Sequence, residues 1–242
     1  MGSPNLELAA AGAGASMELY HATQEKKYAS KAMELAEIIL QCQQREYQPW
    51  RVPLAGYFYT TPQRDHLLHY IHRGHDQAAI TALADLCQTF PNETQWIRWY
   101  SAVASYSEFL KATARYTDPY GMIPSGIYDL NENQEAWYQA QVRNGMALDS
   151  RHYLKMFPAW TSFRGNHGTI LSQTKALSTA AQLRRDLDSG ALAQQQLQWV
   201  VGRNPFAQST MYGEGHDFAP QYTAMSGNMV GSLPVGIETR AD

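Results

Sequence analysis

The chain has little of what marks several protein classes. It contains only two cysteines, a formal net charge of only −3, and no apolar run approaching the roughly 20 residues of a membrane-spanning helix. So weak a charge gives no electrostatic basis for binding nucleic acid or an anionic membrane. The sequence also lacks a P-loop, a Gly-x-Ser-x-Gly motif and a His-Glu-x-x-His motif. Nucleotide-binding, α/β-hydrolase and zinc-protease interpretations therefore have no support.

The two cysteines give no framework for a disulfide scaffold or a metal site. Cys42 and Cys87 each lie among apolar neighbours in a pattern typical of a helix, which favours buried free thiols and leaves a disulfide as the alternative. Neither belongs to a metal-ligand spacing, and we expect no metal and no cofactor. Because cysteine usage does not settle the redox environment, the compartment stays open.

Aromatic side chains, in contrast, are abundant. The 15 Tyr, 6 Trp and 7 Phe can fill a core, or line a groove in which sugar rings stack against their faces. With 44% hydrophobic and 17% charged residues the composition is that of a globular protein. The 242 residues suit one domain or a large part of one.

Hydrophobic periodicity predicts a mainly helical chain. Apolar residues at helical spacing predict helices over 22–46, 63–69, 75–90, 92–117, 133–146, 168–185 and 190–201. Thr61-Pro62 is a helix-start signal, and Asn92 through Gln95 reads as a capping box. Strand signals are weak, so we expect an all-α fold with long irregular connections, a combination that usually carries function.

The two ends of the sequence look different from the rest. Residues 1–16 are small and rich in Ala and Gly, and we expect them to be a disordered or vector-derived leader. Residues 17–242 should form a single unit, because no sharp linker divides them. We expect truncation at both ends.

The first segment with chemical potential is His69–His75. His72 and His75 are three residues apart, so on a helix they share a face and could bind one metal, although no companion acid is placed by the sequence. A loop that contacts substrate through His72 and His75 is the functional interpretation, and a solvated helix start is the structural one.

The second segment, 116–128, is rich in Tyr, Pro and Gly and is followed by Asp129 and Glu132. Its turns are fixed by Pro and Gly, which suits a rigid connector. An aromatic wall beside a sugar site is the alternative.

The third segment is Phe163–Gly168, where Arg164, Asn166 and His167 lie between two glycines at a predicted helix start. Such a place favours anionic or hydroxyl-rich groups. We expect these three residues to bind substrate, with plain helix entry as the alternative.

The fourth segment ends the last predicted helix. Gly202 can cap that helix and Asn204-Pro205 can turn the chain. Polar groups then gather without a comparable structural reason, and we expect Tyr212, His216 and Arg240 to contact substrate. The carboxylates that we expect to act as acid or base are Glu214, Asp217 and Glu238, because cleavage of a glycoside needs two carboxyl groups.

The stretch Trp199–Gly215, WVVGRNPFAQSTMYGEG, resembles the end of the catalytic domain in glycoside hydrolase family 9 and related six-hairpin glycosidases. The matching positions are Gly202, Arg203, Asn204, Pro205, Ser209, Gly213 and Gly215. The segments around Arg73-Gly74-His75 and Tyr120–Ser125 are similar to those of a bacterial branch of polysaccharide-degrading proteins. This resemblance implies an (α/α)6 toroid, incomplete in this chain over 17–242, and hydrolysis of glycosidic bonds.

The match covers about 15 residues strongly, and it does not carry the catalytic groups over. The Asp-Ala-Gly-Asp motif of the family's general base is absent, and Tyr222-Thr223-Ala224 stands near the place of its His-His-Arg motif. A polysaccharide lyase on a toroid, using Tyr212, His167, Asn166 and Arg164, is one alternative. A carbohydrate-binding fragment without catalysis is the other. For the enzyme interpretations the partner is a carbohydrate, and a periplasmic or extracellular location suits the parent protein.

Overall fold

The computed structural model describes residues 5–69, 76–159, 166–220, 229–234 and 236. These residues form seven α-helices, two short 3-10 helices and a small sheet. The helices are α1 (Leu6–Thr23), α2 (Lys26–Cys42), α3 (Asp76–Thr89), α4 (Trp96–Ala114), α5 (Ala136–Arg143), α6 (His167–Arg184) and α7 (Leu187–Val200). The 3-10 helices are η1 (Arg115–Thr117) and η2 (Leu130–Glu132), and the strands are β1 (Gly126–Asp129), β2 (Met146–Ala147) and β3 (His152–Lys155). The expectation of a mainly helical protein is confirmed.

Six of the helices form three hairpins that stack side by side. Each of the pairs α1–α2, α3–α4 and α6–α7 is joined by a short turn and packs along its length. Helix α3 lies between α1 and α6, and α4 contacts both α2 and α7, so the hairpins make two layers. Three hairpins are half of a six-hairpin ring, and the closed toroid stays a prediction.

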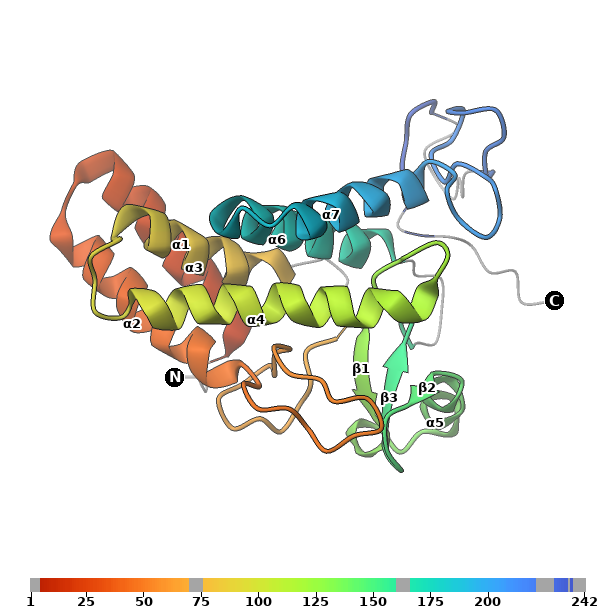
Figure 1. Cartoon of the computed structure of the whole chain (residues 1–242), viewed down its shortest axis with the longest axis horizontal. Helices are drawn as coiled ribbons and strands as arrows, with labels where there is room; N and C mark the ends of the chain where they lie inside the picture. Colours follow the sequence, from red (N-terminus) through yellow and green to blue (C-terminus); the bar gives the residue numbers. More distant parts are fainter. Residues whose placement is uncertain (1–4, 70–75, 160–165, 221–228, 235, 237–242) are drawn as a thin grey trace.

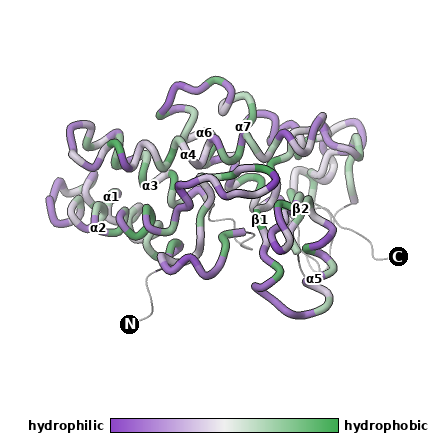
Figure 2. Tube along the Cα trace, turned by 60° about the horizontal axis from the view of Figure 1, so that its bottom comes forward, coloured by the Kyte–Doolittle hydropathy of each residue, from purple (hydrophilic) through white to green (hydrophobic). Residues whose placement is uncertain are grey.

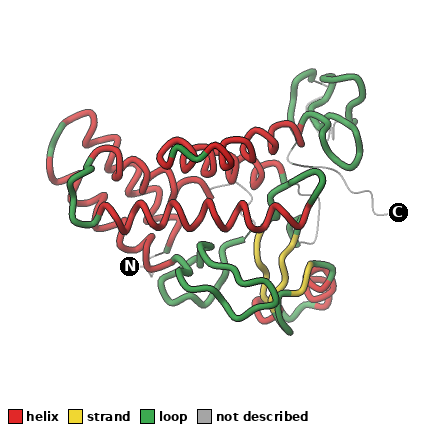
Figure 3. Tube along the Cα trace, in the orientation of Figure 1, coloured by secondary structure: helices red, strands yellow, loops and turns green. Residues whose placement is uncertain are grey.

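The connections at the two ends of the hairpins differ in length. The short hairpin turns lie at one end, on the left of Figure 1, whereas the segment after α7 leaves the opposite end. Figure 3 shows that loops also gather below the helices, around the sheet that connects α4 to α6. The polar sequence segments singled out above fall mostly in these long connections.

Helix α1 corrects the expectation of disorder for residues 6–16 of the leader, whereas its vector-derived origin stays a prediction. Ala is the strongest helix former, and Asn5 caps the helix by accepting a hydrogen bond from the amide of Leu8 at 2.8 Å. A Cβ at Gly12 would lie 2.9 Å from Cδ1 of Leu35, so the small residues let α1 and α2 pack closely. The helix predicted over 22–46 begins later than expected. Gln24 adopts a left-handed conformation that ends α1, and α2 starts at Lys26.

The predicted helix over 63–69 is wrong. Arg64 has a positive φ of 59°, and Leu67 pairs instead with Tyr59 in an isolated antiparallel bridge. The amide of Leu68 donates to the carbonyl of Phe58 at 2.8 Å. The capping box at 92–95 is also not formed, since no side chain caps α4. Of the other six predicted helices, five correspond to α2, α3, α4, α6 and α7, and the sixth, predicted over 133–146, corresponds to the shorter α5.

The small sheet was not expected from the weak strand signals. Its order is β1-β3-β2, and all pairs are antiparallel, with Ile127 opposite Leu154 and Asp129 opposite His152. All four residues of β1 are buried. Because neither face of the strand is exposed to solvent, its sequence lacks the alternation of polar and apolar residues that marks a half-buried strand.

One large core runs through the helical hairpins, and a smaller one holds the end of α7. Trp99, Leu110 and Leu83 are fully buried in the first, and Figure 2 shows hydrophobic and hydrophilic residues alternating along the helices around it. In the second, Met122, Ile170 and Trp199 pack together beneath Met211 and Leu233. Cys42 and Cys87 are both buried and unbonded to each other, which confirms the free thiols. No helix among the described residues is long and apolar enough to cross a membrane.

Candidate functional site

Helix α6 begins with buried polar residues instead of an ordinary cap. Asn166, at the N-cap, is 2% exposed and has a helical conformation, and its side chain makes no capping bond. Its amide nitrogen points at Sδ of Met122, 3.5 Å away. A buried Asn usually satisfies the free amides of the first turn, so its orientation here is unusual.

His167 follows directly and is also 2% exposed. Its Nδ1 lies 2.7 Å from the carbonyl oxygen of Pro234, and its Nε2 is buried without a hydrogen-bond partner in the described part of the chain. Burial lowers the pKa of the imidazole below its ordinary value of 6.5, with the Pro234 carbonyl opposing that shift. His167 is therefore neutral near neutral pH and oriented by a backbone carbonyl.

Three further buried polar atoms without a partner in the described part of the chain lie on α6 and near Pro234. They are Oγ1 of Thr169 and Oε1 of Gln173 on α6, and Oγ of Ser232 two residues before Pro234. Protein interiors leave few such atoms unpaired, and each one calls for an explanation such as a bound water or ligand. We call Asn166, His167, Thr169, Gln173 and Ser232 the α6 polar cluster.

The Gly-Arg-Asn-Pro stretch has a structural role. Gly202 has a positive φ of 124°, and the amide of Arg203 donates to the carbonyl of Gln198 at 2.8 Å, which closes α7 in a Schellman motif. Asn204 is 3% exposed, and its amide group donates to the carbonyls of Trp199 and Gln208 at 2.8 Å each. The cap and turn expected for this stretch are confirmed.

The predicted residues of the following loop lie at the surface. Glu214, His216 and Asp217 are exposed, and Tyr212 is half-buried against Phe218. Oδ2 of Asp217 accepts a hydrogen bond from Gln208 at 3.1 Å. Their exposure leaves the predicted acid or base roles of Glu214 and Asp217 as predictions.

Segment 229–234 brings the third and fourth sequence segments together. The amide of Tyr212 donates to the carbonyl of Ser232 at 3.0 Å, and the amide of Gly231 donates to the carbonyl of Tyr212 at 2.8 Å. A Cβ at Gly231 would lie 3.8 Å from Oε1 of Glu214. Since Pro234 in turn contacts His167, this segment connects Tyr212 and Glu214 to the α6 polar cluster.

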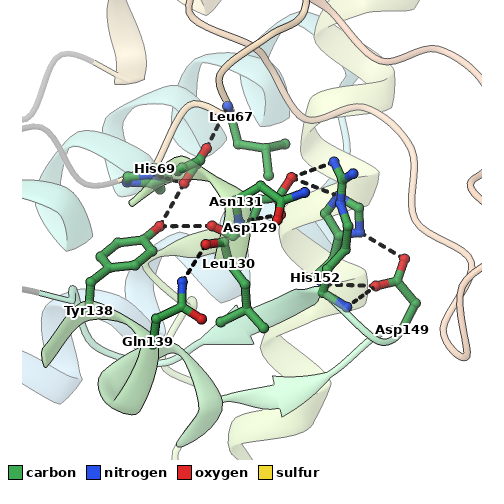
Figure 4. Close-up of polar contacts among 11 residues, drawn as sticks. Leu67, His69, Asp129, Leu130, Asn131, Tyr138, Gln139, Asp149 and His152 are labelled. Atoms are coloured by element: carbon green, nitrogen blue, oxygen red, sulfur yellow. Dashed lines mark hydrogen bonds and ion pairs between the residues drawn. The ribbon is translucent and has the colours of Figure 1, made fainter. Parts of the chain in front are cut away.

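A second polar network, which no sequence pattern predicted, lies at the end of β1, and we call it the β1 network (Figure 4). The Glu132 carboxylate accepts hydrogen bonds from Nε2 of His69 at 2.9 Å, from the Tyr138 hydroxyl at 2.7 Å and from the amide of Leu67 at 3.0 Å. Burial opposes ionisation of Glu132, but these donors outweigh it and hold the pKa of the carboxyl below its ordinary value. The His69 ring stacks on Tyr128 with centroids 4.0 Å apart.

The same network continues across the sheet. Asp129 accepts from the Arg151 guanidinium, and its Oδ2 lies 3.5 Å from Nε2 of His152. Nδ1 of His152 donates to Asp149 at 2.8 Å, and Asp149 also accepts from the backbone amides of residues 151 and 152. Although burial raises the pKa of Asp149, these hydrogen bonds lower it by more.

Because its donors and acceptors are matched, we interpret the β1 network as a structural element that stabilises the fold. It holds residues 67–69, directly before the segment that contains His72 and His75, against β1 and α5. Tyr128 is 1% exposed and cannot line a sugar site, whereas Tyr116 is 43% exposed, so both the rigid connector and the aromatic wall stay predictions for segment 116–128. The only local sequence signal for this network was the spacing of Glu132 and Tyr138, six residues apart. The histidine partner of Glu132, His69, is 63 residues away in the sequence.

Several predicted site residues lie outside the described residues: His72, His75, Arg164, Glu238 and Arg240. Within the described ranges, no group of three or more His, Cys, Asp or Glu side chains is placed to hold a metal ion.

No protein-family model matches the chain. No curated protein matches it either.

Proposed function

We propose that this chain is part of a carbohydrate-processing enzyme built on an (α/α)6 toroid, whose parent protein hydrolyses glycosidic bonds. Three stacked hairpins with short turns at one end and long connections elsewhere are compatible with half of such a ring. The resemblance of 199–215 to six-hairpin glycosidases supports the same architecture. In toroid enzymes the long loops form the face that holds the substrate.

The observation that carries the proposal is the α6 polar cluster. Its unpaired atoms comprise one imidazole nitrogen, one amide oxygen and two hydroxyls. These groups hydrogen-bond well to the hydroxyls of a sugar, which both donate and accept. Ser232 belongs to segment 229–234 and His167 contacts it at Pro234, which connects these two residues to Tyr212 and Glu214.

Catalysis of glycoside cleavage requires a pair of carboxyl groups. Glu214, whose Oε1 lies near Gly231, is the described carboxylate that we assign first, with Asp217 and Glu238 as its proposed partners. Asp129 and Glu132 are less suited, because both are already engaged in the β1 network and Glu132 is held ionised.

A lyase is the second candidate, and the state of His167 favours it. Proton abstraction beside a carboxylate needs a neutral base, and burial keeps His167 in that form. Asn166, Arg164 and Tyr212 would then neutralise the carboxylate or move the proton. A fragment that binds carbohydrate without turnover is the third, supported by the exposure of Glu214 and Asp217.

A reducing-sugar assay of the chain and of a longer version, against a polysaccharide panel, separates these functions. Release of reducing ends without an unsaturated product supports hydrolysis. Glu214→Gln and Asp217→Asn should then lower the rate at least a hundredfold, whereas Glu46→Gln, an exposed carboxylate elsewhere, should not. An unsaturated product absorbing in the near ultraviolet supports the lyase. Binding without any product supports the carbohydrate-binding fragment. The absence of both binding and product refutes the proposal.

A further inference from the structure

His167 has a defined tautomer that follows from its one contact. Its Nδ1 lies 2.7 Å from the carbonyl oxygen of Pro234. A carbonyl oxygen can only accept a hydrogen bond, so Nδ1 must carry the hydrogen. Burial keeps the ring uncharged, because it lowers the pKa of the imidazole. The other nitrogen, Nε2, therefore has a lone pair and no hydrogen.

That lone pair is buried and has no donor opposite it in the described part of the chain. Gln173 repeats the situation: its Nε2 donates to the carbonyl of Pro124 at 3.0 Å, which leaves Oε1 as a second buried acceptor without a donor. Thr169 and Ser232 contribute hydroxyls, which can turn to suit either kind of partner. The two unpaired atoms with a fixed role, Nε2 of His167 and Oε1 of Gln173, are thus both acceptors.

We infer that Nε2 of His167 is a fixed hydrogen-bond acceptor for a hydroxyl group of the ligand, and that the carbonyl of Pro234 is its positioning partner. A hydroxyl has the hydrogen that this nitrogen requires. A carboxylate has none and would place its own lone pairs against that of Nε2, so it does not fit at this position. The sugar identity of the ligand rests on the proposed function, whereas the acceptor assignment does not.

The acceptor assignment is tested by nuclear magnetic resonance on the ¹⁵N-labelled chain. Long-range ¹H–¹⁵N spectra at pH 7.5 distinguish a protonated from an unprotonated ring nitrogen, and the spectrum of His167→Asn identifies the signals among the eight histidines. We expect a protonated Nδ1 and an unprotonated Nε2. A protonated Nε2, in either the other tautomer or the charged ring, overturns the inference whatever the chain binds.

The ligand assignment is tested with the same variant. The side-chain amide of Asn can replace the Nδ1 donor to Pro234 but offers nothing at the position of Nε2. His21→Asn is the matched control, because His21 is bonded to Asp85 on α3, in a different part of the fold. The probes are four-residue gluco-, xylo- and manno-oligosaccharides, measured by calorimetry.

For any probe that binds, His167→Asn should weaken binding at least tenfold with an unchanged melting temperature, and His21→Asn should bind as the wild type does. Equal affinity of His167→Asn and wild type overturns the ligand assignment. Failure of the wild type to bind any carbohydrate refutes the proposed function, and the tautomer measurement still decides whether Nε2 is an acceptor.

Discussion

The two ends of helix α6 are built in opposite ways. At its C-terminal end, Arg184 pairs with Glu108 at 2.8 Å and with Asp186 at 3.2 Å, and Lys111 pairs with Asp186 at 2.9 Å. At its N-terminal end, Asn166 makes no cap and His167 leaves Nε2 without a partner in the described residues. The charged groups at the C-terminal end are paired, whereas polar atoms at the N-terminal end have no hydrogen-bond partner among the described residues.

This difference separates stabilising from functional chemistry within one element. A matched network lowers the free energy of the folded state, whereas buried unpaired groups raise it by about 1–3 kcal/mol each. Each such group calls for an explanation, such as a bound water, a ligand or a role in the reaction. Substitutions at the hairpin-turn end should therefore change stability, and substitutions in the α6 polar cluster should change binding.

Asp186→Ala should give the largest loss of stability. Asp186 caps α7 through the amides of Asp188 and Ser189, and its charge holds Lys111 and Arg184. Losing the cap and one of the two carboxylates that pair with Lys111 and Arg184, while Glu108 remains, should cost about 3 kcal/mol in urea unfolding. Asp186→Asn keeps an acceptor for the cap and removes the charge, so it should cost about half as much. Equal stability of all three proteins would show that this end is not the stabilising one.

Asn204→Ala should cost about 2 kcal/mol, because it leaves the carbonyls of Trp199 and Gln208 without the amide donors that now reach them. Proteolysis of the native protein should also cut faster within 204–220. Arg203→Ala, an exposed neighbour in the same Gly-Arg-Asn-Pro stretch, should change unfolding by less than about 0.5 kcal/mol. A larger effect at Arg203 than at Asn204 would contradict the structural role of Asn204.

Glu132→Gln should destabilise by about 1.5 kcal/mol, since an amide brings its own hydrogens to a place that three donors already fill. Tyr138→Phe removes one of those donors and should cost about 1 kcal/mol. In a double-mutant cycle by urea unfolding, the two changes should couple. Additive losses would show that the Tyr138 hydroxyl and Glu132 do not act together.

The helices were predictable because their signal is local. The spacing of apolar residues located α3, α4, α6 and α7 to within a few residues. Helix α1 was missed because an Ala- and Gly-rich run carries almost no amphipathic pattern, and its burial depends on α2 and α3. The strand β1 was missed for a related reason, since both of its faces are buried.

The candidate site could be predicted only in part, because its geometry depends on distant partners. A polar group between two glycines pointed to Asn166 and His167, but the contact that fixes the His167 ring comes from Pro234, 67 residues away. Thr169 and Gln173 looked like ordinary helix residues, and their unpaired atoms are apparent only once the helix is buried. Likewise, the segment 63–69 could not be recognised as extended, because Glu132 reaches it across 65 residues.

The smallest effect that we expect is the contribution of His167 to the pH dependence of stability. Because burial holds its pKa below the ordinary value of 6.5, the unfolded chain binds a proton at a higher pH than the folded chain does. The contribution of His167 to the free energy of unfolding should therefore be fully present above pH 6.5. It should decline as the pH falls toward the pKa of the folded state, by at most about 1.4 kcal/mol per pH unit. His167→Asn cannot titrate, so subtracting its urea-unfolding profile from that of the wild type removes the contributions of the other histidines. The difference should slope downward toward acid below pH 6.5. An upward slope would mean that a buried negative charge stabilises the protonated His167, and the α6 start would then resemble the ion-paired end of the same helix.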